Sequence, residues 1–170
     1  MKASSRRLAI GAAFVLSILF ALPSRILAGS REQFGAQHPE ILTGKWTLSL
    51  EESSLGSDPY EQFDDWTLTF TQVTKTALAW SSNATIHGNA LAFSWAGPID
   101  GSQKPLIGLA GSDAYRWRMH ALIRLSDLGH GETKRDTVTI SANGEVMTIR
   151  DRSKTSHGVA FATLVMHRQQ

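Results

Sequence analysis

The chain has 170 residues, no cysteine, 17 basic and 15 acidic side chains, and a formal charge of +2. This length fits one domain plus a processed segment, and the absence of cysteine excludes a disulfide scaffold, a thiolate zinc site and a cysteine nucleophile. A hydrophobic fraction of 42% and a charged fraction of 19% are typical of a folded globular chain rather than a disordered one.

The first 28 residues are arranged like a secretory signal. Lys2, Arg6 and Arg7 precede an uncharged, mostly apolar run over 8–22, and small residues offer a cleavage point after Ala28. Fifteen helical residues span about 22 Å, which is shorter than the ~30 Å hydrocarbon core of a membrane. The pattern favours a cleaved signal over a retained inner-membrane anchor. It predicts a periplasmic or secreted protein without stable membrane insertion after cleavage.

Removing residues 1–28 changes the charge of the chain. Lys2, Arg6, Arg7 and Arg25 leave with the signal, so 17 less 4 leaves 13 basic residues against all 15 acidic ones, a formal charge of −2. No concentrated basic stripe with stacking aromatic residues remains in the sequence. Nucleic acid is therefore not an expected partner.

Residues 29–40 are polar and lack periodicity, and we expect 29–43 to be a flexible lead-in to a single domain at 44–170. Within that domain, apolar and polar side chains alternate with the period of two that is typical of half-buried strands. The alternation predicts strands over 45–50, 66–71, 76–80, 91–95, 115–125, 138–140, 147–149 and 159–166. A loop at 51–59 interrupts it, as does a turn-rich stretch at 97–114, which is either a lid or a further short strand around Leu106-Ile107.

Asn143-Gly144 is the clearest local turn signal. Both residue types tolerate a positive φ, so the pair fits a two-residue type I′ hairpin turn. The predicted register pairs Ile140 with Met147 and Val138 with Ile149. All four apolar side chains then share one face, which supports the register.

Short strands separated by turns, with no long amphipathic helix, predict an all-β fold. Sequential hairpins favour an up-and-down antiparallel β-barrel of about eight to ten strands. Closure of such a barrel removes the unpaired edges that an open sheet would expose.

Gly44-Lys45-Trp46 opens the first predicted strand and resembles the Gly-x-Trp signature at the start of lipocalins. Further pieces resemble small secreted bacterial lipocalin-like domains: W-T-L-T-F at 66–70, D-G-x-x-x-P at 100–105, T-I-S-A-N-G-E-V-M-T-I at 139–149 and H-R-Q-Q at 167–170. The resemblance implies a calycin-type barrel, in which the signature Trp closes the base and an Arg near the end of the last strand packs over it. Trp46 and Arg168 hold those positions here, which makes them the expected closure pair.

A barrel of this size is either filled by side chains or holds one small ligand. The chain has five tryptophans, and inward aromatic residues are the expected lining of a cavity. The candidates are Trp66, Phe70, Trp80, Phe93, Trp95, Tyr115 and Trp117. We therefore expect a monomer that binds a small apolar or aromatic molecule non-covalently. The alternative is a non-enzymatic envelope structural or interaction protein, or an inhibitor, with a filled core.

Three His-Gly dipeptides, beginning at His87, His130 and His157, lie between predicted strands. Alternate loops of an up-and-down barrel emerge at one end, so three imidazoles there could bind Zn²⁺ or Cu²⁺. The alternative is that His and Gly are ordinary turn residues. His120 is the one histidine inside a predicted strand, but its parity points it away from the aromatic face. No cofactor is predicted.

Hydrolytic chemistry finds little support in the sequence. No Gly-x-Ser-x-Gly elbow and no His-Glu-x-x-His motif occurs, and the adjacent acidic pairs are expected in solvated loops. Arg116, Arg118 and Arg124 are expected to form an outward basic row on the strand at 115–125, either solvated or facing an anionic surface. The protein is therefore not expected to be an enzyme.

Overall fold

The computed structural model describes residues 35–56 and 62–170. The predicted signal at 1–28, the start of the lead-in and part of the loop at 51–59 lie outside the described residues. Ten strands and one short 3₁₀ helix make up the described part. They are η1 (Pro39–Leu42), β1 (Gly44–Ser54), β2 (Phe63–Val73), β3 (Ala77–Ile86), β4 (Asn89–Pro98), β5 (Lys104–Pro105), β6 (Ser112–Arg118), β7 (Ala121–Gly129), β8 (Glu132–Ile140), β9 (Val146–Thr155) and β10 (Gly158–Arg168).

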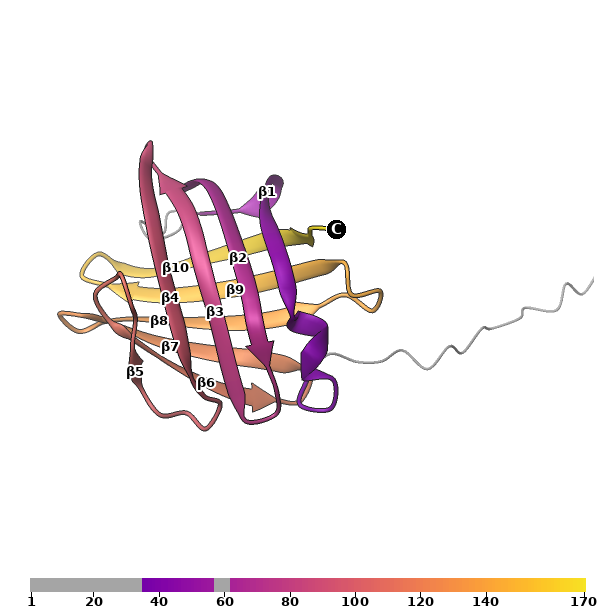
Figure 1. Cartoon of the computed structure of the whole chain (residues 1–170). Coiled ribbons are helices and arrows are strands. Elements are labelled where there is room, and N and C mark those ends of the chain that lie inside the picture. The colour runs from indigo at the N-terminus through magenta and orange to yellow at the C-terminus, as the bar shows by residue number, and fades with distance from the viewer. Residues whose placement is uncertain (1–34, 57–61) are drawn as a thin grey trace, which may run out of the picture.

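The strands form one antiparallel sheet in the order β4-β3-β2-β1-β10-β9-β8-β7-β6-β5. β1 pairs with β10, and this pairing joins the first and last parts of the chain. In Figure 1, β2, β3 and β4 cross steeply over the layer formed by β6 to β10, and the sheet wraps around an interior between them. The predicted all-β, up-and-down antiparallel barrel is confirmed, with a strand number at the upper end of the expected range.

The barrel is nearly closed, and its seam lies between β4 and β5. Across this seam, the described residues form a single bridge, in which Ser94 and Ile107 exchange two backbone hydrogen bonds of 2.9 Å each. The indole N–H of Trp95 also donates to the carbonyl oxygen of Lys104 at 3.2 Å. Within the turn-rich stretch at 97–114, the two residues of β5 form a short strand and Ile107 forms the single bridge. The short strand predicted around Leu106-Ile107 is therefore found one to two residues earlier in the chain.

The long strand predicted at 115–125 is wrong, because the chain reverses in its middle. β6 ends at Arg118 and β7 begins at Ala121, with Met119 and His120 forming the turn. Met119 takes a φ of +50° and its side chain is 80% exposed. The reversal contains no Gly, Pro or Asn, so the sequence gives no turn signal there. His120 lies in this turn and not inside a strand.

The reversal changes which side chains face the interior. In the β6–β7 register, Tyr115 lies opposite Arg124 and Trp117 lies opposite Leu122. Directly opposed residues of an antiparallel pair share a face. Arg124 therefore points inward, and the outward basic row predicted from Arg116, Arg118 and Arg124 is wrong at its third member.

Met119→Gly is expected to raise the free energy of unfolding by about 0.5–1 kcal/mol. A non-glycine residue in the left-handed region is strained by roughly 1–2 kcal/mol, and glycine removes most of that strain at a smaller entropic cost. Urea denaturation followed by tryptophan fluorescence measures the change. The matched control is Ala121→Gly, two residues away in β7, where φ is not positive. There glycine should destabilise the protein, and equal effects at the two sites would contradict the observed turn.

The hairpin around Asn143-Gly144 has the predicted register but a different turn. Ile140 pairs with Met147 and Val138 pairs with Ile149, as expected. The turn itself is closed by a hydrogen bond of 2.9 Å from the Gly144 N–H to the Ser141 carbonyl oxygen. Its central residues are thus Ala142 and Asn143, and only Gly144 has a positive φ, of 77°. The predicted two-residue type I′ turn is therefore wrong, although the strands around it are aligned correctly.

The ends of the first strand also differ from expectation. Glu51 to Ser54 continue β1, with a shift of register between Ser49 and Ser54, so the predicted loop starts later. Before β1, the last residues of the lead-in form η1, whose Leu42 is fully buried. The expectation of a flexible lead-in is therefore wrong for Pro39–Leu42, because Leu42 belongs to the hydrophobic core.

No helix in the described ranges, 35–56 and 62–170, has the length and apolar character that crossing a membrane requires.

Candidate functional site

The three predicted histidines lie in three separate turns. His87-Gly88 and His130-Gly131 each form a two-residue turn in which both residues have a positive φ, of 49° and 75° in the first and 54° and 79° in the second. His157 lies in the turn between β9 and β10. Among the described residues, no three or more His, Cys, Asp or Glu side chains are grouped so that they could hold a metal ion. The structure therefore does not bring the three histidines together, and two of the three His-Gly pairs are explained by turn geometry.

Trp46 and Arg168 lie together at the base of the barrel, where β1 pairs with β10. The guanidinium carbon of Arg168 lies 4.3 Å from the centroid of the fully buried Trp46 ring. Arg168 also donates to the carbonyl oxygens of Gly144 at 2.8 Å, Thr43 at 2.6 Å and Ile41. The Trp46 indole donates to the carbonyl oxygen of Leu42 at 2.9 Å. These contacts hold residues 41–43 before β1 and the turn between β8 and β9 against the base of the barrel.

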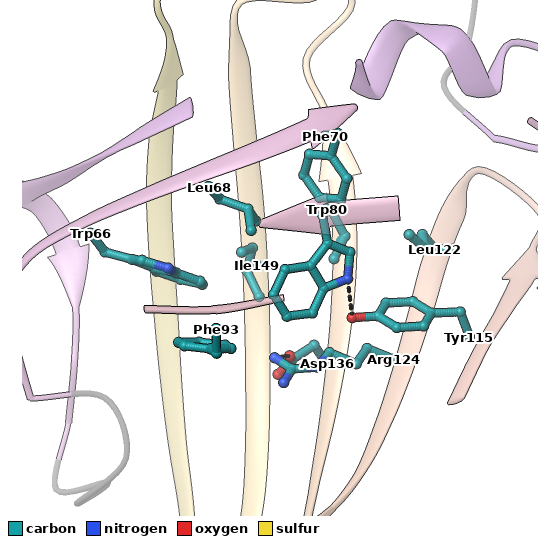
Figure 2. Close-up of a pocket in the computed structure, with 11 residues that line it drawn as sticks. Trp66, Leu68, Phe70, Trp80, Phe93, Tyr115, Leu122, Arg124, Asp136 and Ile149 are labelled. Carbon is teal, nitrogen blue, oxygen red and sulfur yellow. Dashed lines mark hydrogen bonds and ion pairs between the residues drawn. The ribbon is translucent and has the colours of Figure 1, made fainter. Parts of the chain in front are cut away.

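One half of the interior is apolar and aromatic. It is built from inward side chains of β2, β3 and β4, which Figure 2 shows gathered around the Trp80 indole. Trp80 meets Phe93 edge to face, with ring centroids 5.6 Å apart, and Trp66 stacks on Phe63 at 4.8 Å. The Trp66 N–H is satisfied by Ser82 Oγ at 2.6 Å. This half is a packed aromatic wall with its polar atoms already paired.

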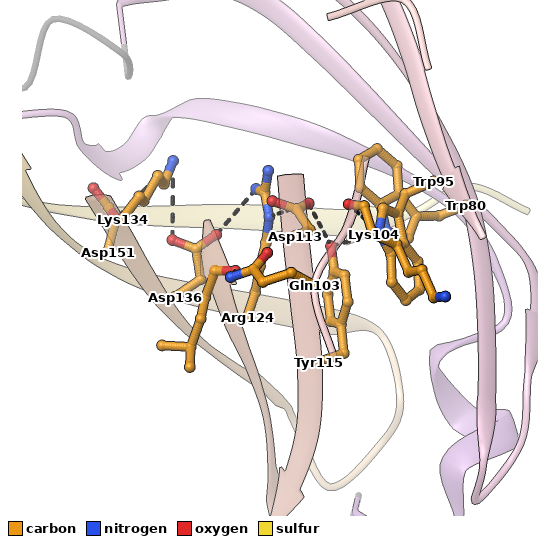
Figure 3. A network of polar contacts seen from close by, with 11 residues as sticks. Trp80, Trp95, Gln103, Lys104, Asp113, Tyr115, Arg124, Lys134, Asp136 and Asp151 are labelled. Carbon is orange, nitrogen blue, oxygen red and sulfur yellow. Dashed lines mark hydrogen bonds and ion pairs between the residues drawn. The ribbon is translucent and has the colours of Figure 1, made fainter. Parts of the chain in front are cut away.

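The other half carries a buried ion network across β6, β7, β8 and β9. Arg124 donates from Nε to Asp113 Oδ2 at 2.7 Å and from Nη1 to Asp136 Oδ2 at 3.1 Å. The Lys134 ammonium lies 3.9 Å from Asp136 Oδ1 and 4.0 Å from Asp151 Oδ1. Acidic and basic groups thus alternate along the row, as Figure 3 shows.

Tyr115 and Trp80 connect the ion network to the aromatic wall. The Trp80 indole donates to the Tyr115 hydroxyl at 2.9 Å, and that hydroxyl donates to Asp113 Oδ2 at 3.2 Å. Arg124 also lies 5.7 Å from the Trp80 ring centroid. The polar and aromatic halves therefore form one connected interior.

Burial governs the electrostatics of this network. Asp113, Asp136 and Asp151 are each at most 3% exposed. Burial raises the pKa of Tyr115 well above its ordinary value, which keeps the phenol neutral. Burial alone would lower the pKa of Arg124, but the negative charges around it outweigh that effect and raise the pKa above its ordinary value. Arg124 therefore stays charged, with two carboxylates as its partners.

A cavity of about 280 Å³ opens between the aromatic wall and the ion network. A much smaller space of about 30 Å³ lies deeper, and the two share Trp66, Phe93 and Arg124 as lining residues. The larger cavity is lined by Phe63, Trp66, Ile86, Leu91, Phe93, Leu106, Leu109, Ala110, Arg124, Leu128 and Lys134. Its charged lining residues are both basic. Aromatic rings fill most of the barrel around the smaller space. The larger free volume lies near the seam, where Leu106, Leu109 and Ala110 follow β5.

The predicted ligand-binding residues divide into two groups. Five of them line one or both spaces: Trp66, Phe70, Trp80, Phe93 and Tyr115. Trp95 is 1% exposed and packs against Tyr115, and Trp117 donates its indole N–H to the Lys75 carbonyl oxygen at 3.1 Å. Neither of these two lines either space.

The ion network was not predicted from the sequence, although the alternation of side chains carries a signal for it. Lys134 and Asp136 continue the face of Val138 with period two, and Asp151 continues the face of Ile149. Charged residues on strands are usually exposed to solvent, so these three are not expected to continue a buried face. Arg124 was assigned to the wrong face because of the missed reversal at Met119.

The described strands thus form a nearly closed antiparallel barrel with an apolar cavity and a few polar groups that converge on it. No family model and no curated protein matches the sequence. Among solved structures, the chain is similar to the ileal bile acid-binding protein of zebrafish in complex with cholic acid. That match has a TM-score of 0.50 and 9% identity and covers 76% of this chain and 99% of the other.

A second similar structure is the S-type phycobiliprotein lyase CPES from Guillardia theta. Its TM-score is 0.51 with 13% identity, and the match covers 77% of this chain and 90% of the lyase. Identities this low establish likeness of fold alone. This protein thus has a calycin-type β-barrel, the fold implied by its lipocalin resemblance.

Proposed function

We propose that this protein is an exported, non-enzymatic binding protein that holds one small apolar or aromatic molecule non-covalently inside its barrel. The observation that carries the proposal is the cavity of about 280 Å³, in which nine of the eleven lining residues are apolar. Ligand pockets typically start at about 300 Å³, so this cavity lies at the lower limit of that range and suits only a small molecule. Export is inferred from the basic, apolar and small-residue order of residues 1–28.

One of the two fold neighbours supports the binding of a small molecule by a protein of this fold. The zebrafish protein was solved with cholic acid, and the lyase is named for a phycobiliprotein. The alternative of a filled, structural barrel is favoured by one observation, the small deep space of about 30 Å³ beneath the aromatic wall. The two functions differ in whether the larger cavity accepts a molecule, and a binding experiment separates them.

A neutral fluorescent probe, N-phenyl-1-naphthylamine, is expected to bind saturably with one site per chain. Its emission should rise on binding, because the probe leaves water for an apolar space, and tryptophan emission should fall, because Trp66 lines the cavity. Fluorescence titration measures both signals. A linear, non-saturating probe signal would favour the filled barrel.

Leu91→Trp is expected to weaken probe binding at least about tenfold, because a larger ring at this lining position occupies cavity volume. The matched control is Leu50→Trp, since Leu50 lies on β1 and is 46% exposed. Both variants are titrated with the same probe. If the two bind the probe with equal affinity, the ligand does not occupy this cavity.

A further inference from the structure

One end of the larger cavity is bordered by the buried ion network, and the charge of this network affects which ligands can bind there. Arg124 and Lys134 are the two charged residues in the cavity wall. Both are already engaged by carboxylates: Arg124 by Asp113 and Asp136, and Lys134 within 4.0 Å of Asp136 and Asp151. Neither cation therefore stands at the cavity wall without its own counter-charge.

The formal charges of these five side chains do not cancel. Three carboxylates, of Asp113, Asp136 and Asp151, surround two cations, so three negative charges against two positive ones leave a formal charge of −1. Water is almost excluded, since none of the three aspartate residues is more than 3% exposed. Charges in such a place are weakly screened, and an added charge without a free partner is costly to bury.

Arg124 nevertheless has donors left for a ligand. A guanidinium carries five N–H donors, and the contacts with Asp113 and Asp136 use Nε and one hydrogen of Nη1. Its side chain is 14% exposed and lines both the larger cavity and the deeper space. A hydroxyl or carbonyl oxygen can accept such a hydrogen bond without bringing a further charge.

Building on the proposed function, we infer that the ligand is neutral: an apolar body that ends in one hydroxyl or carbonyl acceptor directed at Arg124. A carboxylate on the same body would bring the buried charge at this end of the cavity from −1 to −2. The cavity therefore selects against an acid whose apolar part fits equally well. In this respect it would differ from a protein solved with cholic acid, a carboxylic acid.

The test is displacement of bound N-phenyl-1-naphthylamine from the purified protein by 1-decanol and by decanoic acid at neutral pH. These two competitors have chains of the same length and differ in charge. We expect 1-decanol to bind at least about tenfold more tightly than decanoate. Failure of the probe itself to bind would overturn the proposed function. Displacement by decanoate as good as or better than by 1-decanol, or by neither compound, would overturn the inference and leave interior binding standing.

A variant separates the network charge from the ordinary difference in hydrophobicity between the two compounds. Asp136→Asn makes the network formally neutral, so the ratio of the two dissociation constants should fall at least about fivefold. The matched control is Asp65→Asn, an exposed carboxylate on β2, which should leave the ratio unchanged. If Asp136→Asn does not fold, Asp151→Asn carries the same test at the other end of the row. An unchanged ratio in a folded network variant would overturn the inference.

Discussion

Arg124→Met is expected to lower the free energy of unfolding by about 3–5 kcal/mol, one of the two largest effects in this protein. The substitution leaves Asp113 and Asp136 buried without the cation that binds both of them. Removing one partner of a buried ion pair is far more harmful than removing the whole pair, because the remaining charge has neither water nor a partner. Guanidinium denaturation followed by tryptophan fluorescence measures the loss.

Two further variants make this prediction specific. Arg116→Met removes an exposed arginine from the same hairpin and should change the stability by no more than about 0.5 kcal/mol. Adding Asp113→Asn and Asp136→Asn to Arg124→Met should recover part of the lost stability, because no uncompensated carboxylate then remains beside position 124. A loss below about 1 kcal/mol in Arg124→Met alone would show that Arg124 does not hold the network together.

Arg168→Ala is expected to lower the free energy of unfolding by about 2–4 kcal/mol. The change removes three hydrogen bonds from a charged donor to the carbonyl oxygens of Ile41, Thr43 and Gly144, together with the cation–π contact on Trp46. A single hydrogen bond to a charged group contributes roughly 1.5–3 kcal/mol, and partial exposure of this site to solvent reduces the sum. Thermal and chemical denaturation provide the measurement.

Arg168→Lys tests whether geometry or charge matters at the barrel base. Lysine keeps the charge but lacks the planar fork that reaches three carbonyl oxygens at once, so most of the loss should remain. Arg152→Ala, an exposed arginine of β9, is the control and should have little effect. If Arg168→Lys is as stable as the unsubstituted protein, the three directed hydrogen bonds are not what closes the base.

The chain has no cysteine and hence no disulfide, and Arg124 and Arg168 stabilise different parts of it. Arg168 binds backbone carbonyls and fastens the lead-in and a turn to the base. Arg124 binds side chains from β6 and β8 in the interior. The first contributes to closure of the barrel, and the second determines the electrostatic character of the cavity.

Strand positions were predictable because alternation is a local property of the chain. The runs at 66–71 and 91–95 lie within β2 and β4, and the register of Val138 with Ile149 followed from apolar residues sharing a face. Two inward aromatic residues of those runs, Trp66 and Phe93, line the cavity. Side-chain parity along one uninterrupted strand therefore identified part of the candidate site.

The same parity failed where the chain turned without a turn signal. Met119 and His120 are not typical turn residues, so the alternation was carried through them and Arg124 was placed on the outer face. Asp113, Asp136 and Asp151 were missed for a related reason. A carboxylate is stable inside a protein only when a cation or a hydrogen-bond donor lies next to it. Their partners, Arg124 and Lys134, are brought next to them only by the pairing of strands in the folded barrel.

The sequence by itself determined the all-β class and the up-and-down order of the hairpins, because these rest on the local alternation of side chains and on turn residues. The pairing of Trp46 with Arg168 was implied by the lipocalin resemblance of Gly44-Lys45-Trp46. Only the tertiary structure decided that a reversal at Met119 turns Arg124 inward, that three buried carboxylates meet two cations, and that free volume lies near the seam rather than in the aromatic end. The formal charge of the chain gave no indication of the charge that a ligand would meet. That charge arises from five side chains that the barrel brings together across four strands and removes from water.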